Sequence, residues 1–553
     1  MRPGNGSPAG ERMRVPVLVA GAGPAGLSLA IELGLRGVPC TVVEQGDARV
    51  EFPTANLLNA RTVEHMRRWG IADDLRYRAF PPDFPRTCIF LTRLNGYELA
   101  RFELPGNGDP ASRSPQSPEG RLWCPKFYFF PALLRRALAL PTVDVRFHCQ
   151  LESFRQDDEQ VTAQVVDLQS GERRVIAADY LVGCDGGSSV VRRQLDIPLR
   201  GVFAEGHNSS IYFRCDLLRY HRHGPAIQYR IHNPRITGGL FAMDGRDHWR
   251  LNIRVGPRDV ATFDPERTLR AALGDGIPFE ILGEKPWSGH RVVAERYRDG
   301  RVFLAGDAAH LLWPLGGFGM NTAIGDAVDL AWKLAAQVQG WGGPLLLDSY
   351  EIERRPIGVR NVEEAATIRA ADTQIPISDV MDTDTPEGAR LREQAARLIE
   401  ATRREEFAIE SPGIDLGYRY DESPICVPDG TPPPPYDTDS YTPTTRPGAR
   451  APHVWLRDGR STLDLFGSGF TLLRLGPRAP DTGGLEAAAR AAGVPLTVLH
   501  LDQPDVVAAY ERALVLVRPD GHVAWRADAP PPDAGRIIDR VRGARPAAPD
   551  ANP

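Results

Sequence analysis

The sequence predicts an α/β protein built from several domains, and three observations lead to this prediction. A glycine-rich loop joins a strand-like run to a helical pattern at residues 15–35. Short alternating apolar and polar runs between residues 200 and 290 indicate an antiparallel sheet. After a proline-dense stretch at 423–452, strand-like runs alternate with an alanine-rich helix. A chain of 553 residues is also too long for one hydrophobic core.

The composition is that of an ordinary globular protein and disfavours several classes of function. Hydrophobic residues make up 42% of the chain and charged residues 25%, which excludes disorder of the whole chain. The 66 basic and 71 acidic residues are interspersed, so the sequence lacks the basic stripe of a nucleic-acid binder. No apolar run reaches the roughly 20 residues of a membrane span, and the seven cysteines show no CxxC or zinc-ligand spacing. We therefore expect a cytoplasmic protein with no nucleic-acid, membrane or metal partner.

The first motif is the loop Gly21-x-Gly23-x-x-Gly26, which follows a strand and opens a helix. Gly21 permits a tight turn, Gly23 lets the backbone approach a pyrophosphate, and Gly26 allows close packing of helix on strand. The N–H groups at the helix N-terminus stabilise phosphate charge. Glu44 ends the next strand, where a carboxylate accepts hydrogen bonds from ribose hydroxyls and repels a 2′-phosphate. The segment therefore predicts a Rossmann-type site for FAD or NAD rather than NADP.

Two further segments place an acidic residue at the end of a strand, before a glycine-rich turn and a helix. One contains Asp307 and leads into a helix predicted at about 321–338. The other contains Asp185 and a short helix that carries Arg192. Ligands of open α/β sheets bind beyond the carboxyl ends of the strands, which favours a site here. Each segment by itself also fits a well-capped helix start.

Together the three motifs resemble those of the class A FAD-dependent aromatic hydroxylases. The glycine loop matches the family's ADP-binding glycines, residues 184–192 match its DG motif, and residues 301–335 match its GD segment. Residues 415–420 and 446–456 are similar to members that carry a third domain. The resemblance implies an α/β fold with a Rossmann-type FAD-binding domain, a β-sheet substrate domain and a C-terminal thioredoxin-like domain.

The expected domain boundaries follow from this resemblance and from the changes in composition. The FAD-binding domain is expected to be discontinuous, at 14–80, 105–200 and 285–410. The substrate domain is expected at 81–104 and 201–284. The remaining segments are a Pro-rich linker at 411–452, the thioredoxin-like domain at 453–545, and flexible tails at 1–13 and 546–553. Because the third domain has no CxxC, we expect it to serve as support or as a dimer contact.

The family's residues carry over to this sequence position by position. The expected cofactor-binding residues are Gly21, Gly23, Pro24, Ala25, Gly26, Glu44, Gln45, Lys126, Asp185, Asp307, Pro314, Gly317, Gly319, Met320 and Asn321. Among these, Pro314 and Gly317 are expected to position the flavin ring, and Asp307 to bind the ribityl chain. Thr54 stands where family members commonly carry a basic residue, and we hypothesise that Lys126 supplies that charge. The sequence identifies no catalytic base.

The resemblance also implies a reaction. FAD is expected to be reduced by NAD(P)H, with NADPH favoured, and to react with O2 to form a C4a-hydroperoxide that hydroxylates a phenolic or polycyclic, polyketide-like aromatic. One alternative is Baeyer–Villiger or oxidative-decarboxylating oxygenation of a similar scaffold. Another is a non-catalytic flavin protein that binds a reactive intermediate. A plain NAD dehydrogenase is less favoured, because the GD segment would then have no ligand. Both a monomer and a homodimer fit the sequence.

Overall fold

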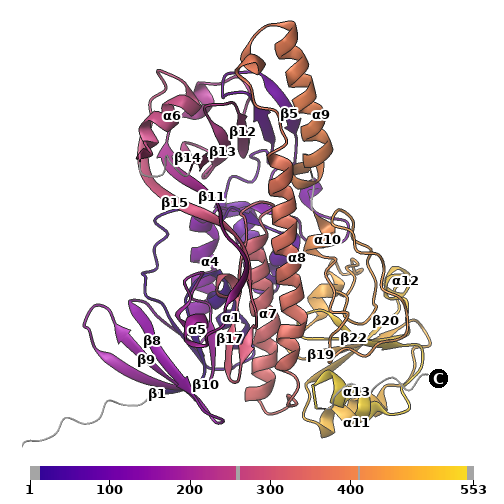
Figure 1. Cartoon of the computed structure of the whole chain (residues 1–553). Coiled ribbons are helices and arrows are strands. Elements are labelled where there is room, and N and C mark those ends of the chain that lie inside the picture. Colours follow the sequence, from indigo (N-terminus) through magenta and orange to yellow (C-terminus); the bar gives the residue numbers. More distant parts are fainter. Residues whose placement is uncertain (1–12, 257–261, 409–410, 545–553) are drawn as a thin grey trace, which may run out of the picture.

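The computed structural model describes residues 13–256, 262–408 and 411–544. The predicted tails lie outside these ranges, except that Met13 begins the first strand. Within the described residues, two eight-stranded sheets and one four-stranded sheet form the layers of an α/β protein, which confirms the predicted fold class. Figure 1 shows the eight-stranded sheet with the strands at 199–214 and 280–294 (the substrate-side sheet) above the eight-stranded sheet that begins at Met13 (the Rossmann-type sheet). The C-terminal domain lies beside the two central helices at 318–338 and 348–372.

The Rossmann-type sheet is mostly parallel. Its central strands β1 (Met13–Ala20), β2 (Cys40–Val43) and β17 (Val302–Leu304) are nearly continuous apolar runs because both faces of the sheet are covered there. Its strand order is β16-β17-β10-β1-β2-β7, and a β8–β9 extension pairs with β10. The remaining bounds are β7 (Val143–Arg146), β8 (Cys149–Gln156), β9 (Val161–Asp167), β10 (Arg173–Gly183) and β16 (Arg298–Asp299). Strands β17, β10 and β1 are parallel neighbours, so their carboxyl ends meet at one edge.

The substrate-side sheet is largely antiparallel, as the alternating pattern at 200–290 predicted. Its order is β18-β15-β11-β14-β13-β12-β4-β5. The bounds are β4 (Cys88–Leu91), β5 (Glu98–Phe102), β11 (Leu199–Arg214), β12 (Gln228–His232), β13 (Thr237–Ala242), β14 (His248–Val255), β15 (Glu280–Ala294) and β18 (His310–Leu311). Because β18 belongs to the GD segment, this sheet reaches directly into the predicted flavin site.

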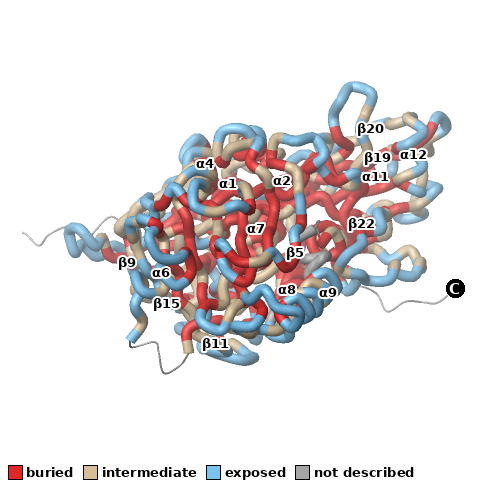
Figure 2. Tube along the Cα trace, turned by 90° about the horizontal axis from the view of Figure 1, so that it is seen from above, coloured by how far each residue is buried: buried red, intermediate tan, exposed pale blue. Residues whose placement is uncertain are grey.

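Two helices connect the layers. α7 (Phe318–Val338) is buried along most of its length and runs through the middle of the molecule, as Figure 2 shows. α8 (Asp348–Asp372) packs along it. The other helices are α1 (Pro24–Leu35), α2 (Ala60–Arg68), α3 (Ala72–Asp74), α4 (Lys126–Leu138), α5 (Val190–Gln194), α6 (Pro265–Leu273), α9 (Pro386–Ala408) and α10 (Pro412–Asp415). A two-stranded pair joins β3 (Leu57–Leu58) to β6 (Leu122–Trp123).

The C-terminal domain has the strand order β20-β19-β21-β22, with one parallel and two antiparallel pairs. Its elements are β19 (Phe470–Leu475), β20 (Leu496–Leu501), β21 (Leu514–Val517), β22 (Val523–Ala527), α11 (Gly483–Ala491), α12 (Pro504–Tyr510) and α13 (Ala534–Val541). This domain shares an apolar cluster with α7, in which Phe470 packs edge-on against Trp332. Residues 411–452 are packed as well: Asp415 pairs with Arg121, and Arg450 pairs with Glu64.

Candidate flavin and substrate site

The three sequence motifs meet at the carboxyl ends of β1, β10 and β17. A Cβ at Gly21, where φ is +100°, would lie 2.4 Å from the carbonyl oxygen of Cys184 in the DG motif. A Cβ at Gly26 would lie 1.9 Å from the carbonyl oxygen of Gly21. A Cβ at Gly23 would have no neighbour within 4 Å. Two of the glycines therefore serve the packing of the loop, whereas Gly23 leaves open space beside the helix.

This open space lies at the N-terminus of α1. Gly23 is the N-cap and offers no side chain to the free N–H groups, and the first turn carries no acidic residue. Such an end attracts an anion. Glu44 is held next to it, because Oε2 accepts a hydrogen bond from Ala22 N (2.8 Å) and Oε1 accepts one from Gly46 N (2.7 Å). The arrangement fits the pyrophosphate and ribose of a dinucleotide.

Asp185 and Asp307 have different surroundings. Asp185 Oδ2 accepts from Val190 N (2.7 Å) and Val191 N (3.1 Å), which caps α5, while Oδ1 is buried without a partner among the described residues. Arg192 Nη1 donates to the carbonyl oxygens of Gly187 and Ala308, both at 3.1 Å, and so ties the DG motif to the GD segment. The sequence pointed to the DG helix but not to this link.

The Asp307 side chain lines the cavity and is exposed to it. The protein around the cavity desolvates this carboxylate and raises its pKa, although His310 and Lys126 act in the opposite direction. Asn321, by contrast, lies outside the cavity lining and fixes the loop: its Nδ2 donates to Leu57 O (3.1 Å) and Gly317 O (2.6 Å). Asp307 is therefore the acid available to a ligand here.

A cavity of about 960 Å³ joins the motifs to the substrate-side sheet. Of the expected cofactor-binding residues, those that line it are Gly23, Pro24, Ala25, Lys126, Asp307, Pro314, Gly317, Gly319 and Met320. Those outside its lining are Gly21, Gly26, Glu44, Gln45, Asp185 and Asn321, and Gln45 is exposed. The volume lies at the upper end of the roughly 300–1,000 Å³ of ligand pockets, so it admits a flavin ring and a substrate together.

Aromatic side chains that the sequence analysis did not single out form part of the wall. Trp287 lines the cavity, and its Nε1 donates to Ser210 Oγ at 2.9 Å. Trp313 packs edge-on against it, with ring centroids 6.0 Å apart. Gly289 makes room for Trp313, since a Cβ there would lie 2.3 Å from the indole ring. Such walls favour flat apolar ligands and exclude water.

Two cations flank the segment around Thr54. Lys126 N donates to Ala55 O (2.8 Å), and burial lowers the pKa of its ammonium, which makes no hydrogen bond or ion pair with any residue the structure describes. Arg250 on β14 donates from Nη1 to Thr54 O (2.8 Å) and Pro53 O (2.5 Å). Burial lowers the pKa of Arg250 to about 10. No motif in the sequence pointed to Arg250, yet the period of two along β14 places it on the opposite face of the strand from buried Trp249.

One cluster of possible metal ligands lies apart from the cavity lining. His248 Nδ1 is 3.0 Å from Asp244 Oδ2 and 2.9 Å from Asp247 Oδ1. All three residues are partly exposed, and the contacts are those of an ordinary hydrogen-bonded turn. The cluster gives no ground for assigning a metal site, and the absence of a metal partner stays a prediction.

A Rossmann-type sheet whose strand ends share one cavity with a second, aromatic-lined sheet is the arrangement expected of a flavin-dependent oxygenase. Matches to two protein-family models support this class of protein. A family model described as "FAD binding domain" matches residues 14–365, and one described as "Aromatic-ring hydroxylase, C-terminal" matches residues 444–544. The chain belongs to the class A FAD-dependent aromatic hydroxylases, and it is an enzyme of the monooxygenase type.

Individual relatives cover nearly the whole chain. The "FAD-dependent monooxygenase apdD" of Emericella nidulans is 33% identical over 95% of this chain and 90% of its own length. The structure "Chromopyrrolic acid-soaked RebC with bound 7-carboxy-K252c" superposes with a TM-score of 0.88 at 38% identity, covering 97% of this chain and all of that one. The complex of aklavinone-11 hydroxylase with FAD and aklavinone superposes with a TM-score of 0.81 at 32% identity, covering 96% of this chain and all of that one.

The described helices include no membrane span. None of them is both long and apolar enough to cross a bilayer.

Proposed function

We propose that the protein is an NAD(P)H-consuming, FAD-dependent monooxygenase that hydroxylates a large, acidic aromatic compound. The observation that carries this proposal is the single cavity shared by the cofactor motifs and the aromatic-walled substrate sheet. Bound FAD supplies electron transfer from the nicotinamide and the activation of O2. The protein's part is to bind, to orient and to exclude water.

Each part of the site has a role in this proposal. The N-terminus of α1 binds the pyrophosphate, and Glu44 binds the adenosine ribose. Asp307 binds the ribityl chain, and the loop with Pro314 and Gly317 positions the flavin ring. Trp287 orients the aromatic substrate and keeps water from the reacting atoms. NADPH is the favoured reductant.

The cavity's charge supports an acidic substrate. Asp307 is the only acid among the described residues that line it, and it belongs to the cofactor side. Arg230, Arg250 and Lys285 line the substrate side. Arg250 is 5% exposed and bonds to carbonyl oxygens rather than to a carboxylate of the described chain. A buried cation without an acidic partner favours a ligand that brings the negative charge. The RebC complexes, whose names include carboxylated compounds, are in keeping with this.

The test is anaerobic reduction of the FAD-loaded enzyme by NADPH and by NADH, followed in the visible flavin bands. Polycyclic aromatic acids and phenols are added one at a time, and product is then formed under ¹⁸O2. We expect one substrate class to accelerate flavin bleaching at least tenfold and to gain one ¹⁸O atom. Loss of CO2 from the same substrate would instead support oxidative decarboxylation. A ligand that binds but neither accelerates flavin reduction nor gains ¹⁸O would support the intermediate-binding alternative.

Substrate charge gives a separate prediction. An aromatic carboxylic acid is expected to bind about tenfold more tightly than its methyl ester, which corresponds to about 1.4 kcal/mol. Arg250→Met should remove this preference, because it removes the buried cation. Arg254→Met, which changes an exposed arginine on the same strand, is the control. The dissociation constants are measured from the flavin spectral shift. An acid preference that survives Arg250→Met would refute this assignment.

Lys126 gives a prediction about the cofactor. Lys126→Gln is expected to weaken FAD binding about five- to tenfold, since Lys126 lines the cavity and its ammonium forms no ion pair with a described residue that would neutralise it. Lys285→Gln, at the exposed substrate side, should have a smaller effect. FAD is titrated into each apoprotein and followed by quenching of flavin fluorescence. Unchanged affinity in Lys126→Gln would show that Lys126 does not replace the missing basic residue.

A further inference from the structure

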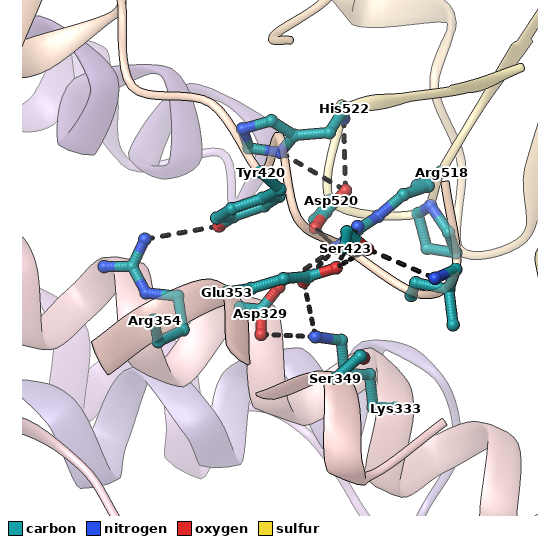
Figure 3. Close-up of polar contacts among 12 residues, drawn as sticks. Asp329, Lys333, Ser349, Glu353, Arg354, Tyr420, Ser423, Arg518, Asp520 and His522 are labelled. Atoms are coloured by element: carbon teal, nitrogen blue, oxygen red, sulfur yellow. Dashed lines mark hydrogen bonds and ion pairs between the residues drawn. The ribbon is translucent and has the colours of Figure 1, made fainter. Parts of the chain in front are cut away.

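A buried charge cluster joins the C-terminal domain to α7 and α8 (Figure 3). Arg518, in the turn between β21 and β22, donates from Nη1 to Glu353 Oε1 (2.6 Å) and from Nη2 to Asp329 Oδ1 (3.0 Å). Lys333 Nζ donates to Asp329 Oδ2 (2.7 Å) and Glu353 Oε2 (2.6 Å). Asp520 and Ser423 complete the cluster. The side chains of Arg518, Lys333 and Glu353 are fully buried.

A second series of contacts leads from the same turn toward the cofactor motifs. The His522 ring packs against Tyr420, with centroids 4.4 Å apart. Tyr420 OH accepts from Arg354 Nη1 (3.2 Å), and Arg354 Nε donates to Asp326 Oδ1 (2.9 Å). Figure 3 shows Arg354 and Tyr420 facing each other on the side of the cluster next to α8. Arg354 thereby connects the turn to α7.

This series of contacts ends at Asp326, which contacts the GD segment. Its Oδ2 accepts from Gly306 N (3.2 Å) and is 2.8 Å from His310 Nε2. Gly306 directly precedes Asp307, which lines the cavity. The α7 helix that carries Asp326 also begins at Phe318, directly after Gly317. One helix therefore contacts the acid-bearing loop and forms the edge of the predicted flavin site.

The buried charge cluster is better suited to fixing how the C-terminal domain, α7 and α8 are arranged than to increasing the free energy of unfolding. Buried ion pairs lose their hydration, and apolar replacements of similar volume are often as stable. Their geometry, however, permits few alternative arrangements of the elements that they join. Apolar packing between Phe470 and Trp332 already attaches the domain to α7. Attachment of the domain therefore does not account for the buried charges around Arg518.

We propose that Arg518 is a positioning residue for FAD binding: through Glu353 and Asp329, and through the Tyr420 ring that links it to Arg354, it holds α7 and the Gly306–Asp307 loop in the arrangement that accepts the cofactor. The C-terminal domain is then part of the support of the cofactor site, although no described residue after Ala323 lines the cavity. The proposal rests on FAD binding alone and is independent of the substrate and of the reaction.

The test compares two full-length variants, Arg518→Met and Arg526→Met. Arg526 is also buried in the C-terminal domain, but its ion pairs are with Asp429 and Glu511, and its other described hydrogen bonds are within 431–445. Both variants should lower the Tm. At a temperature where both apoproteins are folded, Arg518→Met is expected to raise the Kd for FAD at least tenfold and to speed FAD release. Arg526→Met should stay within twofold of the wild type.

The proposal is overturned if both variants weaken FAD equally, or if folded Arg518→Met binds FAD as the wild type does. Should Arg518→Met fail to fold, Tyr420→Phe and Tyr510→Phe replace the pair. Tyr420→Phe removes only the hydroxyl that Arg354 contacts, whereas the Tyr510 hydroxyl donates to Pro452 O within the C-terminal region. Weaker FAD binding in Tyr420→Phe alone would support the proposal, and equal Kd values in the two variants would refute it.

Discussion

Replacing Gly23 by valine is expected to leave the apoprotein folded and to weaken FAD binding at least 100-fold. Gly23 has φ −68° and ψ −178°, a conformation open to any residue. A Cβ there would meet nothing within 4 Å. The added methyl groups would instead occupy the space at the N-terminus of α1 where a pyrophosphate approaches the backbone. The Tm of the apoprotein and the Kd for FAD are the two measurements.

Gly26→Ala is the matched change in the same loop. Its Cβ would lie 1.9 Å from the Gly21 carbonyl oxygen, so the helix must move away from β1. We expect a lower Tm in the apoprotein together with lost FAD binding. If Gly23→Val destabilised the apoprotein as much as Gly26→Ala, the separation of a packing glycine from a ligand glycine would be wrong.

The buried cluster of Figure 3 is expected to respond very unequally to the loss of its carboxylates. Glu353→Gln should lower the free energy of unfolding by about 3–5 kcal/mol, and Asp329→Asn by less than about 1 kcal/mol. Within ion-pair distance, Asp329, Glu353 and Asp520 share two lysine or arginine cations of the described chain, Lys333 and Arg518. Three carboxylates cannot all be ionised there without one unbalanced buried charge.

The pKa shifts indicate which carboxyl keeps its proton. Burial raises the pKa of Asp329 well above its usual value, despite Lys333. Burial also opposes ionisation of Glu353, but Arg518 and Lys333 outweigh it and hold the pKa of Glu353 below its usual value. Burial lowers the pKa of His522 to about 4, so its imidazole adds no charge at pH 7. An amide at position 329 thus resembles the protonated aspartic acid. An amide at position 353 instead removes a negative charge, so that Lys333 and Arg518 are no longer balanced by the remaining carboxylates.

Denaturant unfolding of the two apoproteins at pH 7 measures these differences. Arg526→Met again serves as a reference for the loss of a buried ion pair elsewhere in the C-terminal domain. Equal destabilisation by Glu353→Gln and Asp329→Asn would mean that the proton is not held on Asp329.

The local patterns of the sequence were sufficient to predict the fold class and the cofactor. The strand–glycine–helix spacing around Gly21 to Gly26, and the acids that end β10 and β17, depend on residues close together in the chain. Backbone geometry makes such patterns recognisable without the rest of the fold. Asp307, Pro314 and Gly317 were predicted from the family resemblance of these motifs, and the structure brings all three to one cavity. Their roles as FAD contacts stay predictions.

Only the tertiary structure decided which side chains, distant in the sequence, complete the cavity and which ones connect the C-terminal domain to α7 and α8. Arg250 reaches the Thr54 carbonyl from a strand 196 residues further along the chain, and Arg518 reaches Asp329 across 189 residues. Trp313 fits beside Trp287 because a glycine on a neighbouring strand leaves room. A sequence pattern shows which residues share a strand face or a helix face, but not which face of another element they meet. Burial and charge pairing depend on how such faces pack against each other. For this reason the local motifs indicated the cofactor, whereas the packing of the domains determined the cavity.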